Sequence, residues 1–185
     1  MKKIVLTFGL ISGAMMALML VITMPFVDKI GFDKAEILGY ATMVLSFLMV
    51  YAGIRSYRDN VGGGSITFAR AAAVGLLITL ISCFCYVVTW EILYFNLPSM
   101  HQFMDKYAEY MADQARASGA SQEAIQVQLL EIGKYKELYE NPLFNAVITF
   151  IEPFPVGLII TLISAAILRK RTRHLLAETQ TSGNV

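Results

Sequence analysis

The chain has 185 residues, of which 56% are hydrophobic and only 16% are charged. A soluble domain of this size carries more charge and fewer apolar side chains, so the composition excludes an ordinary water-soluble protein and favours a membrane protein. The net charge of +1 is uninformative as a total, whereas the distribution of charge along the chain is informative.

Four apolar stretches predict an all-α membrane protein with four transmembrane helices. Each stretch holds about 20 residues, which at a rise of about 1.5 Å per residue can cross a hydrocarbon core about 30 Å thick. We expect the spans over residues 4–26, 37–54, 71–95 and 143–168, within a single membrane domain.

The first stretch follows Lys2 and Lys3, as the apolar region of a cleaved signal peptide would. It is too long for a signal peptide, and no cleavage site of small residues precedes Pro25. We therefore expect a retained first span that begins on the cytoplasmic side.

Small residues recur every four positions in two of the spans. Gly9, Gly13 and Ala17 do so in the first span and predict a smooth stripe along which another helix can approach closely. The third span has a second stripe of this kind: Ala71, Gly75 and Thr79.

Residues 98–141 form the one long polar segment, between the third and fourth spans. Gly119 is placed to end one helix and Ser121 to cap the next, and Asn141 with Pro142 ends the second helix. The first helix has apolar residues at helical spacing: Met100, Phe103, Met104, Tyr107, Tyr110 and Met111. We therefore expect an amphipathic helical hairpin between helices 3 and 4.

Basic residues are concentrated on one side of the predicted spans. The other side, which includes the hairpin, holds six basic and ten acidic residues. The positive-inside rule therefore predicts cytoplasmic termini, a cytoplasmic tail over residues 172–185, and an extracytoplasmic hairpin. The residues expected to anchor the fourth span at cytoplasmic headgroups, where anionic lipids are attracted, are Arg169, Lys170, Arg171 and Arg173.

Pro153 and Pro155 interrupt the fourth span. Because proline has no N–H, the carbonyls of Thr149 and Ile151 lose their helical hydrogen-bond partners. Two shapes fit this pattern: one kinked span, or two half-helices that meet at Glu152. We favour the kink, because residues 156–168 alone cover only about 20 Å.

Glu152 and Glu91 are the two acidic residues within reach of the membrane. Counted from the basic anchors of their spans, they lie about 25 and 31 Å away, with no lysine or arginine in the same layer. Two close carboxylates without a cation bind a proton or a cation. Glu152, Glu91 and the carbonyls of Thr149 and Ile151 are thus a candidate proton or cation site. Alternatively, Glu91 is solvated among the headgroups and Glu152 bonds to the kinked backbone.

No motif in the sequence indicates an enzyme. It has no nucleophile with a base at the required spacing, no paired metal ligands and no nucleotide-binding loop. We expect a protein without catalytic activity, cofactor or nucleic-acid partner. The expected partners are the lipid bilayer and either a second copy of the chain or another membrane protein.

Three segments together resemble a known family. They are residues 64–75, the turn at Gly119, and residues 139–169 with Glu-Pro-Phe-Pro-Val-Gly at 152–157. They are similar to the family catalogued as domain of unknown function 4199, which comprises small bacterial integral membrane proteins. The resemblance implies four spans and a location in the bacterial envelope, here the cytoplasmic membrane. It implies no activity and no functional residues.

Two functional hypotheses remain open from the sequence. The first is a non-enzymatic envelope protein that acts through association of its helices or its hairpin. The alternative is a small ion- or proton-coupled transporter or channel subunit that uses Glu152 at the kinked span.

Overall fold

The structure is a computed structural model that describes residues 1–97, 100 and 102–169. Within these residues every regular element is a helix. Four helical segments are long and apolar enough to cross a membrane: Lys2–Ile30, Phe32–Asn60, Phe68–Asn96 and Pro142–Leu168. This confirms the predicted all-helical class with four membrane-spanning helices.

The first three spans are longer than the apolar stretches that predict them. α1 covers Lys2–Thr23 and continues through the short helices η1 (Met24–Phe26) and α2 (Val27–Ile30). Gly31, with φ of 85°, separates α2 from α3 (Phe32–Asn60), and Thr67 caps α4 (Phe68–Asn96). The helices extend further because their polar end residues form helical hydrogen bonds outside the expected hydrocarbon layer.

The rest of the described chain forms two helix pairs. α6 (Phe103–Ala117) and α7 (Gln122–Tyr139) are joined through Gly119, which has φ of 80°. The Ser121 side chain caps α7 by accepting from the backbone N–H of Ala124 at 3.2 Å. α8 (Pro142–Ile151) is capped by Asn141, and α9 (Pro153–Leu168) follows after Glu152.

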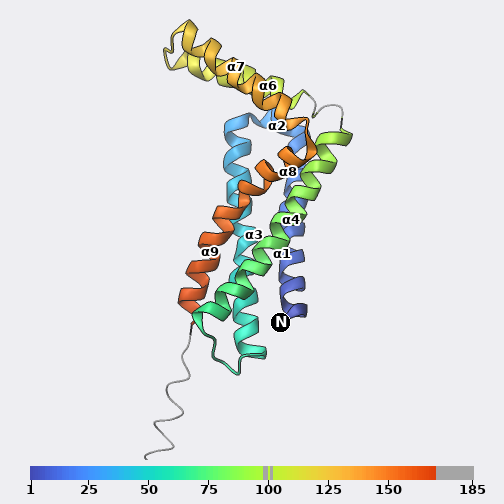
Figure 1. Cartoon of the computed structure of the whole chain (residues 1–185), viewed down its shortest axis with the longest axis vertical. Coiled ribbons are helices and arrows are strands. Elements are labelled where there is room, and N and C mark those ends of the chain that lie inside the picture. Colours follow the sequence, from blue (N-terminus) through green and yellow to red (C-terminus); the bar gives the residue numbers. More distant parts are fainter. Residues whose placement is uncertain (98–99, 101, 170–185) are drawn as a thin grey trace, which may run out of the picture.

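The spanning helices pack most closely through small residues. α1 contacts α3 and α4, and α9 contacts the same two helices from another side (Figure 1). A Cβ added at Gly9 would lie 2.8 Å from the Ile81 side chain, and one at Gly13 would lie 2.6 Å from Cys85 Cβ. The close approach predicted for the Gly9 and Gly13 stripe is therefore confirmed, with α4 as the partner helix.

Side-chain hydroxyls link the spans inside the core. The Ser12 hydroxyl donates to the Ser46 carbonyl at 2.9 Å, which joins α1 to α3. The hydroxyls of Thr79 and Thr161 lie 3.0 Å apart, which joins α4 to α9. Because an unsatisfied hydroxyl is costly in an apolar layer, these contacts favour one helix arrangement over others.

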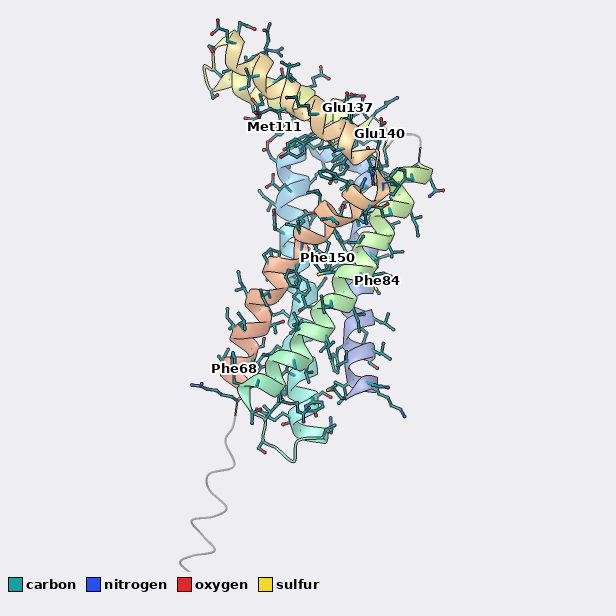
Figure 2. All side chains as sticks on the ribbon, in the orientation of Figure 1. Phe68, Phe84, Met111, Glu137, Glu140 and Phe150 are labelled. Carbon is teal, nitrogen blue, oxygen red and sulfur yellow. The ribbon has the colours of Figure 1, made fainter. Side chains whose placement is uncertain are left out.

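The outward faces of the spanning helices are apolar. Leu18 is 62% exposed on α1, and Phe84 is 67% exposed on α4. In Figure 2, Phe68 lies at the end of the bundle opposite α6 and α7, whereas Glu137 lies on α7 and Glu140 directly follows that helix. Such an exterior suits lipid as the surrounding solvent. We call the end at Phe68 the basic end and the other the hairpin end.

The basic end carries Lys2, Arg55, Arg70 and Arg169 among the described residues. Arg169 immediately follows α9, as expected for an anchor of that span. Three further predicted anchors, and the predicted tail over 172–185, lie outside the described residues: Lys170, Arg171 and Arg173.

Candidate ligand cavity beneath α6 and α7

A cavity of about 520 Å³ lies at the hairpin end. Its lining comes from α1, α3, α4, α6, α7 and α8, with α6 and α7 covering it. Its size falls within the range of small-molecule sites, about 300–1,000 Å³. Most lining side chains are apolar or aromatic, including five methionines: Met16, Met19, Met24, Met43 and Met104.

The break in the fourth span explains why a cavity forms here. α9 packs against both α3 and α4, but beyond Glu152 α8 packs against α4 and α7 and makes no substantial contact with α3. Pro153 and Pro155 remove the two N–H groups that would hold α8 in line with α9. The backbone at Glu152 stays in the right-handed helical region, with φ of −64° and ψ of −60°. The fourth span is therefore kinked, and the space between α3 and α8 is left open.

Glu152 stands at this kink and lines the cavity. The hydroxyl of Tyr86 on α4 donates to Glu152 Oε2 at 3.1 Å. The Glu152 side chain is exposed rather than sealed in the core. The carboxylate is thus held from one side by Tyr86 and is accessible from the other.

Glu36 on α3 is a second carboxylate in the lining. One turn further on, Tyr40 also lines the cavity, and both side chains are exposed. No lysine, arginine or histidine occurs among the described residues of the lining. The cavity therefore combines two acidic groups with aromatic and thioether surfaces.

The four residues of the predicted proton or cation site do not converge on this cavity, and only Glu152 lines it. The buried Thr149 hydroxyl donates to Asn145 Oδ1 at 3.2 Å. Ile151 is 55% exposed on the outside of the bundle. Glu91 lies outside the lining, and its Oε1 is buried without a hydrogen-bond partner among the described residues. In this structure Glu36, rather than Glu91, shares the cavity with Glu152.

A buried polar network fixes α8 beside the cavity. The fully buried Asn145 accepts from Trp90 Nε1 at 2.8 Å, and its Nδ2 donates to the Tyr139 carbonyl at 3.1 Å. These bonds connect α4, α8 and the end of α7. Because every partner is held by at least one hydrogen bond, the network favours a single position of α8 against α4.

Aromatic contacts hold α6 over the cavity. The Phe32 ring centroid lies 5.7 Å from that of Phe103, 5.8 Å from Tyr107 and 5.1 Å from Tyr110. The Tyr110 hydroxyl also donates to Asp33, and this hydrogen bond raises the pKa of Tyr110 above its ordinary value. Such ring pairs contribute about 0.5–1.5 kcal/mol each beyond their burial.

Two ion pairs strengthen this end of the molecule. Lys106 on α6 pairs with Asp28 on α2 at 2.5 Å. Within the hairpin, Lys136 on α7 pairs with Asp105 on α6 at 2.5 Å, and the hydrogen bond to Asp105 raises the pKa of Lys136. α6 and α7 are thus joined to each other and to α2.

Sequence reasoning missed Glu36, Tyr40 and Tyr86 as parts of the site. Glu36 and Tyr40 stand at the start of a span, where acidic and aromatic residues normally meet headgroups and water. Tyr86 stands in a run that is apolar on all sides, so its spacing does not identify the face that it occupies. The only available signal was that Glu36 and Tyr40 lie one helical turn apart.

These features define the class of protein: a multi-pass helical membrane protein with a cavity at one end of its bundle. The described residues contain no group of histidine, cysteine, aspartate or glutamate arranged to hold a metal ion. The chain belongs to the family described as "Protein of unknown function (DUF4199)", whose model matches residues 7–170, in agreement with the resemblance in the sequence. No curated protein and no solved structure matches the chain.

Proposed function

We propose that this protein is a non-enzymatic, multi-pass protein of the bacterial cytoplasmic membrane that binds a small ligand in the cavity beneath α6 and α7. The observation that carries the proposal is the cavity itself, with the carboxylate of Glu152 on its wall and Tyr86 hydrogen-bonded to that carboxylate. Ligand sites in membrane helix bundles are commonly built at breaks in a span.

The proposed orientation places the basic end in the cytoplasm and the hairpin outside. It is supported by the basic residues at the basic end, and by the acidic character of α6, α7 and their surroundings. In this orientation the cavity lies in the outer half of the membrane.

The alternative function is ion- or proton-coupled transport, and it would use the same site through the carboxylate of Glu152. A carboxylate at a proline kink, close to carbonyls that proline has freed, resembles the arrangement by which transporters couple ligand and ion binding. The packed region between the cavity and the basic end would have to open for passage. Ligand binding is the step common to both activities.

Filling the cavity tests the proposal. Gly39 on α3 lines it, and a Cβ added there meets no atom within 4 Å. Gly39→Trp should therefore fill the space without distorting the bundle. Small molecules that copurify with the wild type in lipid nanodiscs would be extracted and identified by mass spectrometry. We expect them to be lost in Gly39→Trp and kept in Gly133→Trp, a matched change at an open position on α7.

The transport arm is tested by flux into proteoliposomes, with wild type compared with Glu152→Gln. Flux that requires Glu152 supports transport. Binding without flux restricts the function to ligand binding. If the same small molecules copurify with the wild type and with Gly39→Trp, the proposal as a whole is contradicted.

A second candidate function is association with another protein through α7. Val127, Leu130 and Leu138 are 56%, 67% and 48% exposed on one side of this helix. Outside the membrane, such a face favours a contact with a further chain. Native size in detergent tests this candidate: Leu130→Glu should reduce the size of any complex, whereas Gln128→Glu, on another side of α7, should not.

A further inference from the structure

The cavity has a charge that its own walls do not balance. Glu36 and Glu152 both line it, and the described lining has no basic side chain. Three lysines at this end of the molecule are engaged elsewhere: Lys106 and Lys136 in ion pairs, and Lys29 above the Phe26 ring at 5.7 Å. Two carboxylates that share a space without a basic side chain favour a cation within it.

Aromatic rings make the same space suitable for an organic cation. The rings of Tyr40, Tyr86, Tyr107, Tyr135 and Tyr139 contribute to the walls, together with two phenylalanine rings. Ring faces attract a quaternary ammonium or a protonated amine, most strongly where water is excluded. A metal ion would not use these surfaces, and the described residues offer no metal-ligand cluster.

The methionines and the volume of the cavity indicate how apolar and how large the ligand is. Five thioether side chains line the cavity, and flexible methionines adapt to apolar groups of different shapes. A volume of about 520 Å³ accommodates a molecule much larger than a simple ammonium ion.

We infer that the cavity binds an amphipathic organic cation, with the cationic group between Glu152 and Glu36 and the apolar body against the methionines and aromatic rings. The inference rests on the proposed ligand-binding function and specifies its ligand class. Anionic and sugar-like ligands are disfavoured, because two carboxylates repel the former and an apolar wall leaves the hydroxyls of the latter unpaired.

The test uses two probes of the same shape and opposite charge, tetraphenylphosphonium and tetraphenylborate. The protein is used as the full chain in lipid nanodiscs, and partitioning into empty nanodiscs is subtracted. Trp90, the sole tryptophan, lies with its ring centroid 5.7 Å from the cavity-lining Phe103 and reports binding by fluorescence. We expect the wild type to bind the phosphonium at least about tenfold more tightly than the borate.

Charge-removing substitutions assign the preference to the two carboxylates. Glu152→Gln should weaken phosphonium binding about tenfold, and Glu36→Gln severalfold, with borate binding unchanged or improved. Glu109→Gln removes the same charge from the exposed surface of α6 and should change affinity less than about twofold. Because Glu36 is exposed, its substitution keeps the test valid even if Glu152→Gln does not fold.

The outcomes separate this inference from the function on which it rests. Equal affinity for both probes, or a preference that survives both glutamine substitutions, overturns the cationic ligand class. If Gly39→Trp still abolishes binding of both probes in that case, the ligand cavity stands. If Gly39→Trp changes the binding of neither probe, the proposed function fails as well.

Discussion

The two halves of the bundle are built from equally apolar helices but pack differently. Toward the basic end, α1, α3, α4 and α9 meet, and Phe47, Val50 and Ile54 are completely buried. At the hairpin end, α8 has left α3, and a cavity lies between them. Lipid is as apolar as these side chains, so apolar composition alone does not draw helices together in a membrane. Close packing depends on small residues and on complementary shape. The proline kink directs α8 away from α3, so these two helices do not pack closely at the hairpin end.

The largest effect is expected where the tight half is overfilled. A Cβ at Gly157 on α9 would lie 2.5 Å from the Thr79 side chain and 2.8 Å from the Phe47 ring. Gly157→Leu should lower the free energy of unfolding by about 3 kcal/mol, because neither neighbour can move away freely. Thermal unfolding in detergent measures the loss.

Gly39→Leu is the matched control for the loose half. It makes the same change on α3 at a position where a Cβ meets no atom within 4 Å. Its thermal midpoint should stay the same or rise slightly, since leucine favours helix more than glycine does. Equal losses in the two variants would contradict the contrast between the halves.

A smaller loss is expected from the polar network that positions α8. Asn145→Ala leaves the buried Trp90 N–H without its acceptor at 2.8 Å and frees the Tyr139 carbonyl. The cost should be about 2 kcal/mol. Trp90 fluorescence followed during unfolding measures both the stability and the environment of the ring. Asn96→Ala, which breaks a hydrogen bond to the carbonyl of Ile92 in the same helix, should have little effect.

A local effect is expected at the cover of the cavity. Phe32→Ala removes the ring that contacts Phe103, Tyr107 and Tyr110. Protection of α6 against hydrogen exchange should fall by about 1–2 kcal/mol, while the tight half stays protected. Phe84→Ala, at an outward-facing position on α4, should leave α6 unchanged. Loss of protection throughout the bundle would show that α6 is part of the core rather than a cover.

The smallest effect is expected from pH. Hydrogen bonds to Asp33 and Asp105 raise the pKa of Tyr110 above 10.0 and that of Lys136 above 10.5. Because the folded-state pKa is the higher one, these contacts contribute fully below the unfolded-state pKa and are lost as pH rises through the folded-state value. The hairpin should therefore loosen only above about pH 10, with no change near neutrality.

Trp90 fluorescence, through its contact with Phe103, measures this loosening. Asp33→Asn weakens one of the two contacts at every pH, so its alkaline change should be smaller than that of the wild type. An identical alkaline transition in the two proteins would exclude a contribution from Tyr110.

The sequence was sufficient for the membrane class and for local features of the helices. Length and hydropathy predict the spans, and the spacing of Gly9 and Gly13 predicts the close approach of another helix, which in the structure is α4. Pro153 and Pro155 identify the place where the fourth span bends. These features depend on residues close together in the chain, which a sequence displays directly.

The cavity was out of reach because it depends on which faces meet. A span that is apolar on all sides has no polar face to show its orientation, so the contact of Tyr86 with Glu152 could not be inferred. Depth along the span suggested Glu91 as the companion of Glu152, but depth does not specify direction around the helix. The contact of Phe32 with α6 joins residues about 70 positions apart and has no local signal.

Only two residues separate the end of α7 at Tyr139 from the start of α8 at Pro142. The Asn145 side chain bridges this joint by donating to the Tyr139 carbonyl, and it accepts from Trp90 on α4. We therefore expect α7 and α8 to move together about their contact with α4. A tilt of α7 should therefore be transmitted along α8 to Glu152, which directly follows that helix.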